Sequence, residues 1–84
     1  MNQKELSQII GKNIKKYRTS TFIDGKKLTQ EKLAEAINVS VSLISNLESS
    51  KSNKGISIIN LYKISVVLNT PISKFFEVSN EYKK

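Results

Sequence analysis

Apolar side chains recur along the first part of this 84-residue chain at spacings of three and four, the periodicity of an amphipathic helix. Asn2, with Glu5 three positions later, makes a capping start for such a helix, and the pattern continues to about Thr19. The members of the stripe are Leu6, Ile9, Ile10, Ile14 and Tyr17. We therefore predict a helix over residues 2–19.

Four shorter segments with helical periodicity follow. Thr29 is suited to cap a helix over residues 30–37, and Ser57 is suited to cap a later one. Thr70-Pro71 is a cap followed by a first-turn proline, which begins a short fifth helix. The apolar positions of these segments are Leu33, Ala34 and Ile37, then Val41, Ile44 and Leu47, then Leu61, Ile64 and Leu68, and finally Ile72, Phe75 and Phe76. The pattern predicts an all-α fold of five short helices.

The chain is long enough for one hydrophobic core, so we expect a single domain over residues 1–78 and a short polar tail over residues 79–84. Between the first two helices, residues 20–27 break the helical pattern, and Asp24-Gly25 supplies turn chemistry there. The residues expected to pack in the core are Leu6, Ile10, Ile14, Leu33, Ile37, Ile44, Leu47, Leu61, Ile64 and Leu68.

Residues 39–43, Val-Ser-Val-Ser-Leu, alternate apolar and polar with period two, which on its own is typical of a half-buried strand. No second run of this kind is present to pair with it, and a lone strand leaves its backbone groups without partners. Asn38 suits a left-handed residue that ends the preceding helix, and Ser40 suits the cap of the next. We interpret residues 30–48 as a helix-turn-helix, a motif whose second helix lies in the major groove of DNA.

The chain contains neither cysteine nor histidine, which excludes disulfides, the usual zinc sites and Cys/His catalysis. Its seven acidic residues are scattered and form no paired-carboxylate pattern, so we expect no enzymatic activity and no metal or cofactor. No apolar run approaches the ~20 residues of a membrane-spanning helix, and the start of the chain lacks the pattern of a secretory signal. We therefore expect a cytoplasmic protein.

The chain carries 14 Lys and Arg against 7 Asp and Glu, a net charge of +7 that favours a polyanionic partner. Residues 1–27 hold seven of the basic residues and two of the acidic ones, so 7 − 2 gives +5 for this third of the chain. An anionic membrane surface would also attract such a charge, and the first helix is basic and amphipathic. Because its apolar face is needed for the core of so small a domain, nucleic acid is the better interpretation.

Three stretches of the chain resemble the DNA-binding domain of the lambda-repressor/Cro type, also called the Xre family. They are IGKNIKKYR for the first helix, LTQEKLAEAINVSVSLISNLESSK for the helix-turn-helix and ISIINLYKISVVLNTPISKFF for the last two helices, and they span roughly residues 9–77. The chain departs from the family pattern in Asn38, which replaces a turn glycine, in Ser49-Ser50, and in the longer connection at residues 19–27. The resemblance implies a lambda-repressor-like fold and a transcriptional regulator that binds specific double-stranded DNA sequences.

That longer connection has no single interpretation. Its apolar residues, Phe22 and Ile23, can pack on the flanking helices, while Lys26 and Lys27 can reach the DNA backbone. Equally, the whole segment can be a variable surface loop.

The resemblance also implies roles for individual residues. The base-reading positions, on the helix of about residues 41–48, fall on Val41, Ser42, Ser45 and Asn46. Asn46 is the strongest of these, because its amide can pair bidentately with adenine, whereas Val41 can equally pack on its neighbours. The contacts to backbone phosphates fall on Thr29, Gln30, Ser40, Lys51 and Lys54. For these five, the alternatives are plain helix capping and solvated charges without a DNA contact.

Arg18 is the only arginine among the fourteen basic residues. In the family, an arginine at this place pairs with the glutamate that ends the third helix, here Glu48. A planar guanidinium suits such a partly buried carboxylate because it binds both oxygens at once. The resemblance therefore implies a structural ion pair between Arg18 and Glu48.

The carboxyl-terminal end carries more apolar surface than one short helix hides. We expect it to form the two-fold interface of a homodimer, through Ile72, Phe75, Phe76 and Val78. Two recognition helices would then lie about 34 Å apart, as a dimeric repressor requires. A controller protein of a restriction-modification system or an antitoxin is a close variant, and Glu31 or Glu35 can contact RNA polymerase in an activator. A protein-interaction adaptor is the alternative from another class.

Overall fold

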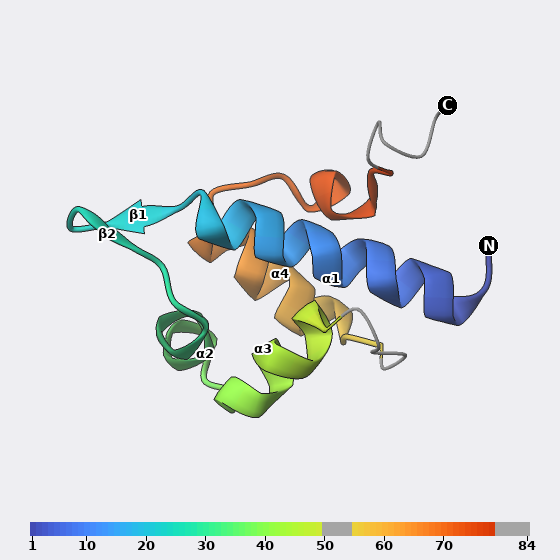
Figure 1. Ribbon diagram of the computed structural model, residues 1–84, viewed down its shortest axis with the longest axis horizontal. Coiled ribbons are helices and arrows are strands. Elements are labelled where there is room, and N and C mark those ends of the chain that lie inside the picture. The colour runs from blue at the N-terminus through green and yellow to red at the C-terminus, as the bar shows by residue number, and fades with distance from the viewer. Residues whose placement is uncertain (50–54, 79–84) are drawn as a thin grey trace.

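The structure, a computed structural model, describes residues 1–49 and 55–78. Its elements in chain order are α1 (Gln3–Thr19), β1 (Phe22–Ile23), β2 (Lys26–Lys27), α2 (Gln30–Ile37), α3 (Val41–Glu48), α4 (Ile58–Val67) and the 3-10 helix η1 (Ile72–Phe76). Figure 1 shows α1 running across the molecule, with α2 and α3 below it, α4 behind it and η1 above it. The predicted tail, residues 79–84, lies outside the described residues.

Each of the four α-helices begins where the sequence predicts, because a side chain there accepts a backbone N–H of the first turn. Asn2 and Glu5 form a capping box, in which the Asn2 side chain accepts from the Glu5 N–H at 2.8 Å. The hydroxyls of Thr29, Ser40 and Ser57 each accept from the N–H three residues on, at 3.1 Å. These starts depend only on interactions within one turn.

Helices α2 and α4 are each followed by an asparagine with left-handed backbone, directly after α2 and two residues after the last residue of α4. Asn38 has φ 60° and ψ 50°, and Asn69 has φ 50°. In both cases the residue after the asparagine donates its N–H to the carbonyl five residues before it, at 2.9 Å, as in a Schellman motif. The predicted turn at Asn38 is thus confirmed, and the alternating stretch at residues 39–43 is a turn followed by the first residues of α3.

The fifth predicted helix is present only as η1, so the described residues contain four α-helices rather than five. Thr70 does not cap it, because its hydroxyl donates to a carbonyl two residues back at 3.0 Å, and Pro71 takes the N-cap position instead of the first turn. The side-chain amide of Asn13, in α1, donates to the carbonyls of Phe75 and Glu77 at 2.8 and 2.9 Å. These bonds hold the segment against α1 and occupy carbonyls that a longer helix would use internally.

Residues 20–27, predicted only as a break between helices, form a small antiparallel hairpin, so the fold is not purely helical. Its cross-strand pairs are Phe22 with Lys27 and Ile23 with Lys26. The two residues between the strands, Asp24 and Gly25, have φ values of 53° and 77°, the signs that a type I′ turn requires. Figure 1 shows the hairpin projecting from the helices, and its strand residues are exposed.

One hydrophobic cluster joins the helices. Of the ten residues predicted for the core, nine are buried, and the exception is Leu6, which is 38% exposed. Leu6 lies near the start of α1, which extends beyond the helices that pack on it (Figure 1). The buried members of the cluster are Ile10, Ile14, Leu28, Leu33, Ala34, Ile37, Ile44, Leu47, Leu61, Ile64, Leu68 and Phe75.

Helices α1 and α3 come into close contact at Gly11. A Cβ atom at this position would overlap the backbone carbonyl oxygen of Leu47 in α3. A glycine inside a helix is less favourable than alanine by roughly 1 kcal/mol, so its presence here has a packing reason. The missing side chain lets the last turn of α3 lie directly against α1.

We predict that Gly11→Ala destabilises the protein, although alanine is the better helix former. The added methyl group meets backbone rather than a movable side chain, so α3 has to shift, at a cost of about 1–3 kcal/mol. Urea unfolding followed by circular dichroism measures the change. Gly55→Ala is the matched control, because no atom of residues 1–49 and 55–78 lies within 4 Å of its added Cβ. Equal stability of the two variants would contradict the close contact.

Candidate nucleic-acid interface

The outer face of α3 carries small, uncharged side chains that are all exposed. The four residues predicted to read bases form this face: Val41, Ser42, Ser45 and Asn46. On the opposite face Ile44 and Leu47 are buried, and the helix packs against both α1 and α2. The structure therefore places the four predicted residues side by side on the solvent side of a helix that is supported from behind.

The starts of α2 and α3 open onto one hollow in the surface. It has a volume of about 420 Å³ and is lined by Arg18, Lys27, Leu28, Thr29, Gln30, Glu31 and Val41. Lys27, the last residue of β2, stands two residues before the Thr29 cap and lines this hollow beside the first turn of α2, where the helix dipole is positive. Glu31 is the single acidic residue in this lining. A basic residue near a helix start is an arrangement that attracts a phosphate group.

The two cap hydroxyls, of Thr29 and Ser40, lie at these helix starts and are exposed. Each oxygen accepts a backbone N–H of its own helix at 3.1 Å. A hydroxyl that accepts in this way still has a hydrogen to donate. Capping and a contact to a phosphate are therefore compatible at both residues.

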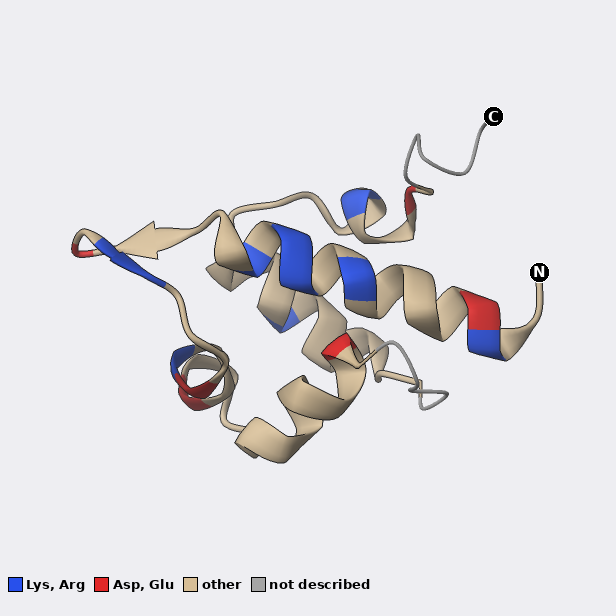
Figure 2. Ribbon diagram, in the orientation of Figure 1, with Lys and Arg blue, Asp and Glu red and all other residues tan. Residues whose placement is uncertain are grey.

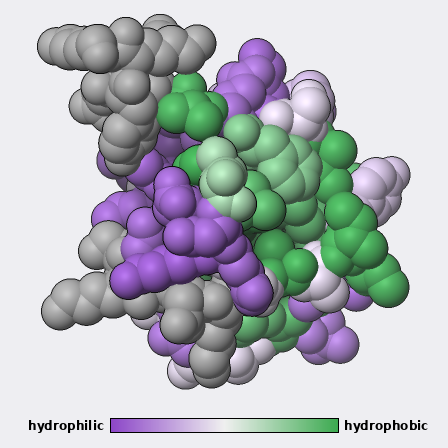
Figure 3. Space-filling view, turned by 90° about the vertical axis from the view of Figure 1, so that its right-hand side faces the viewer, coloured by the Kyte–Doolittle hydropathy of each residue, from purple (hydrophilic) through white to green (hydrophobic). Residues whose placement is uncertain are grey.

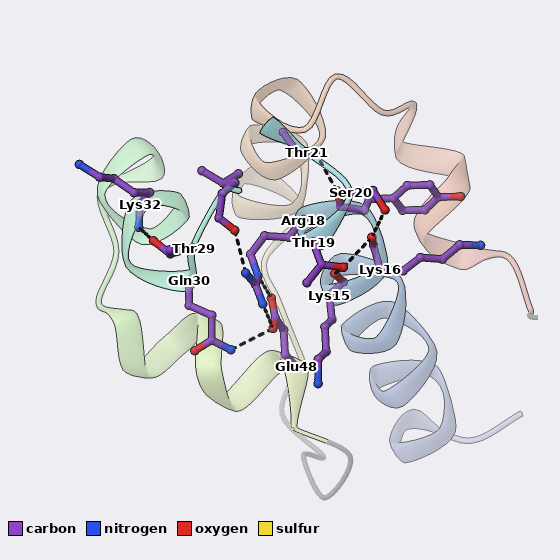
Figure 4. Close-up of polar contacts among 12 residues, drawn as sticks. Lys15, Lys16, Arg18, Thr19, Ser20, Thr21, Thr29, Gln30, Lys32 and Glu48 are labelled. Atoms are coloured by element: carbon purple, nitrogen blue, oxygen red, sulfur yellow. Dashed lines mark hydrogen bonds and ion pairs between the residues drawn. The ribbon is translucent and has the colours of Figure 1, made fainter. Parts of the chain in front are cut away.

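Arg18 and Glu48 form a buried ion pair behind this surface (Figure 4). The guanidinium binds both carboxylate oxygens, with Nε to Oε2 at 2.7 Å and Nη2 to Oε1 at 3.0 Å. Its third nitrogen, Nη1, donates to the Leu28 carbonyl at 2.8 Å. The side chains are only 10% and 2% exposed. One arginine thus ties α1 to the end of α3 and to the segment that leads into α2.

Gln30, predicted to contact a phosphate, has a partner inside the protein. Its Nε2 donates to Oε1 of Glu48 at 2.9 Å, and its side chain is half-buried (Figure 4). A primary amide has two N–H hydrogens, so this bond fixes the side chain and leaves a second hydrogen to donate. Reasoning from the sequence missed this link, because Gln30 and Glu48 lie 18 residues apart and no local pattern connects them.

The described basic residues avoid α3, whose one charged residue is Glu48 (Figure 2). They lie on the other helices and on the hairpin: Lys4, Lys12, Lys15, Lys16, Arg18, Lys26, Lys27, Lys32, Lys63 and Lys74. Lys51 and Lys54, predicted as phosphate contacts, lie outside the described residues. Among the described residues, attraction for a polyanion therefore comes from the flanks of α3, while its outer face offers only neutral groups.

The carboxyl-terminal residues predicted for a dimer interface differ in their exposure. Phe75 is fully buried, and its ring meets that of Tyr17 edge to face, with centroids 5.8 Å apart. Ile72 is half-buried against the core, whereas Phe76 and Val78 are 43% and 39% exposed. Assigning Phe75 to an interface was wrong, because the Asn13 bonds turn this segment so that its ring enters the core.

Helix α2, the turn at the left-handed Asn38 and helix α3 form a helix-turn-helix. The outer face of its second helix, α3, is open to solvent. The sequence model of the Cro/C1-type, Xre-like helix-turn-helix family matches residues 22–75, more than half of the chain, and the chain belongs to that family. The match includes the hairpin and begins after α1. A search of curated proteins found no match. In residues 1–49 and 55–78, no helix has the length and apolar character needed to cross a membrane.

We predict that Arg18→Ala costs about 3 kcal/mol of unfolding free energy, because it leaves the Glu48 carboxylate buried without its ion-pair partner. Urea unfolding measures this loss. Lys74→Ala is the control, since it breaks the pair with Glu77, whose side chains are 48% and 56% exposed, and such a pair contributes at most about 1 kcal/mol. A melt of Arg18→Ala that overlays the wild-type curve would contradict the structural role of the pair.

Proposed function

We propose that the protein is a cytoplasmic regulator of transcription that recognises specific double-stranded DNA sequences with α3 in the major groove. The observation that carries this proposal is the position of α3: its outer face is uncharged and exposed, and its first residue borders the hollow at the start of α2. A major groove about 12 Å wide admits one such helix. Small side chains let the helix backbone lie close to the bases.

Within this proposal, base reading rests on the outer face of α3. The Asn46 amide can donate to and accept from one adenine, a bidentate contact that separates adenine from the other bases. Ser42 and Ser45 offer hydroxyls that donate or accept, so they restrict the sequence less. Val41 supplies methyl groups that can pack on the methyl group of thymine.

The phosphate contacts are assigned to the groups around the hollow. Gln30 donates its second amide hydrogen, and Thr29 and Ser40 donate their hydroxyl hydrogens. Lys27 adds a full positive charge from the hairpin. Lys51 and Lys54 stay predictions from the family resemblance.

The simplest regulator of this kind is a dimeric repressor with two recognition helices about 34 Å apart. A controller protein or an antitoxin would use the same contacts with DNA. Glu31 and Glu35 are exposed on α2, where an activator can meet RNA polymerase. The choice among these regulators depends on the genes under control.

We predict that Asn46→Ala changes which sequences the protein selects. Selection from a randomised duplex pool, followed by sequencing of the retained DNA, should give an inverted repeat for the wild-type protein. The variant should lose the preference for adenine at one position of each half-site, with about 1–3 kcal/mol less discrimination there.

Gln30→Ala is the contrasting variant in the same selection. Because a phosphate contact carries no base information, it should weaken binding to all sequences and leave the preferred repeat unchanged. The proposed function is wrong if the wild-type protein enriches no sequence and shows no DNA binding above background at low salt. A protein-interaction adaptor then becomes the better interpretation.

We predict that Lys27→Ala reduces the salt dependence of DNA binding. Each phosphate neutralised by a cation contributes about 0.9 to the slope of log K against log salt, so losing one contact should reduce the slope by about that amount. Fluorescence anisotropy at several salt concentrations measures it. Lys16→Ala is the matched control, because Lys16 lies on α1 with its ammonium 5.3 Å from the centre of the Tyr17 ring, away from the hollow. Equal slopes of log K against log salt for the two variants would contradict a phosphate contact by Lys27.

A further inference from the structure

The hairpin of β1 and β2 projects from the helices and exposes both apolar and basic side chains (Figure 1). Phe22 is 61% and Ile23 is 48% exposed, and Lys26 and Lys27 are exposed as well. A single exposed apolar side chain is common on a protein surface. Here, however, two large ones occupy a short segment, and neither belongs to the hydrophobic cluster of the described residues. The side chains of the hairpin therefore serve something other than the core.

The register of the hairpin places these side chains on two faces. Phe22 pairs with Lys27, and Ile23 pairs with Lys26. Residues directly opposite one another share a face of the ribbon, whereas successive residues alternate. Lys27 also lines the hollow at the start of α2. Phe22 thus shares its face with the lysine that borders the proposed phosphate contacts.

The base of the hairpin is tied to the helices, so its direction is fixed relative to α3. The Leu28 N–H donates to the Thr21 carbonyl at 2.9 Å, and the Thr21 hydroxyl donates to the Tyr17 carbonyl at 2.7 Å. Arg18 donates to the Leu28 carbonyl at 2.8 Å, and the Leu28 side chain is buried. The arginine that binds the end of α3 therefore also holds the base of the hairpin.

We infer that the hairpin enters the minor groove beside the base pairs read by α3, and that Phe22 favours A·T over G·C pairs there. The inference deepens the proposed function and rests on it, because α3 has to occupy the major groove. It assigns a role to the longer connection of this chain, for which the sequence pattern allows more than one interpretation.

The position of Phe22 relative to the proposed phosphate contacts places it over the neighbouring groove. Each sugar-phosphate backbone of a duplex separates a major from a minor groove. The hollow is lined by Val41 of α3 and by Lys27 but not by Phe22, so Phe22 lies on the side of Lys27 that is away from α3. Opposed residues of an antiparallel pair have Cα atoms about 5 Å apart. A phosphate bound in the hollow then has α3 on one side and Phe22 on the other.

Charge favours DNA as the partner of the hairpin and decides which part of the hairpin meets it. Lys26 and Lys27 are both positive, which suits a polyanion, whereas Asp24 adds a negative charge at the turn. Phosphate groups repel a carboxylate at the turn. The hairpin therefore meets the groove with the face of Phe22 and not with its tip.

The hairpin is too small to be the interface with another protein. Such an interface buries about 800 Å² on each partner, which the side chains of two such short strands cannot supply. The larger apolar surface lies elsewhere: Figure 3, seen from the end of the molecule opposite to the hairpin, shows it gathered on one side of that view. An aromatic ring beside a lysine is instead typical of proteins that insert an apolar side chain into the minor groove.

The chemistry of the minor groove determines what Phe22 can distinguish. A·T pairs present only acceptors there, whereas a G·C pair adds the N2 amino group of guanine. A phenyl ring offers that amino group no strong acceptor, and a buried donor without a partner is costly. Phe22 therefore favours A·T pairs. It favours inosine·cytosine pairs for the same reason, because inosine lacks the amino group of guanine.

Duplexes that differ only in the minor groove test the inference. The repeat selected from the randomised pool is prepared with A·T, G·C or inosine·cytosine pairs next to each half-site, and fluorescence anisotropy measures binding of the full chain. Inosine and guanine present the same major groove. The wild-type protein should nevertheless bind the A·T and inosine·cytosine duplexes at least about fivefold more tightly than the G·C duplex. Phe22→Ala should bind all three equally.

Ile23→Ala is the matched control, because it shortens an exposed apolar side chain on the other face of the same hairpin. It should keep the preference, and thermal melts should show both variants folded. Equal binding of the three duplexes by the wild-type protein would overturn the inference. A preference that survives in Phe22→Ala would also overturn it, because the shape of the DNA would then be its cause. Loss of the preference in both variants would contradict the specific role of Phe22.

Cleavage of the bound DNA locates the hairpin independently. The chain contains no cysteine, so Ile23→Cys offers a single thiol for an iron-EDTA reagent while Phe22 stays in place. The labelled protein should cleave the selected repeat at the base pairs next to each half-site. The same reagent on Tyr62→Cys, at an exposed residue of α4, should not cleave there. Equal cleavage by the two labelled proteins would contradict a hairpin that lies against DNA.

The outcomes also separate this inference from the proposed function. A wild-type protein that selects a repeat but binds all three duplexes equally leaves the proposed function standing and contradicts the role of the hairpin. A wild-type protein that selects no repeat contradicts the proposed function, and the inference with it.

Discussion

The arrangement of the helices depends on one buried guanidinium. Arg18 lies near the end of α1, and its three nitrogens reach the Glu48 carboxylate at the end of α3 and the Leu28 carbonyl before α2. Burial of these charges is tolerable only because each of the three guanidinium nitrogens has an acceptor and each carboxylate oxygen has a donor. A planar group with donors in several directions meets that condition, whereas the point charge of a lysine does not. The position of α3 relative to α1 follows from it.

The Glu48 carboxylate also binds Gln30, the residue proposed to contact a phosphate. Oε1 of Glu48 accepts from Arg18 and also from Gln30, the first residue of α2. Gln30 is therefore held by the pair that holds α3, so that the start of α2 and the outer face of α3, which the proposed function assigns to a phosphate and to the bases, keep a fixed relation. Gly11 completes this geometry, because the absence of a side chain lets α3 rest on α1 next to the pair.

The helix starts, the left-handed end of α2 and nine of ten core positions could be predicted from the sequence, since each depends on residues within one or two turns. What was missed depends on contacts between distant residues or on very short elements. Asn13 binds carbonyls more than 60 residues away, and these bonds decide that Phe75 is buried while Phe76 is not. The strands of the hairpin have two residues each, too few to show a period, although Asp24-Gly25 is a turn signal. The roles of Lys51 and Lys54 rest on the resemblance alone.

If α3 reads bases as proposed, the absence of charge on its outer face limits how strongly one copy can distinguish DNA sequences. One bidentate contact separates the correct base from the wrong one by about 1–3 kcal/mol, and α3 offers one amide, two serines and a valine for this purpose. Specificity of the size that a genome demands therefore has to come from a second copy or from the shape of the DNA. Within the proposed function, α3 would supply the sequence-dependent part of binding, while the lysines on its flanks would supply attraction that is independent of sequence.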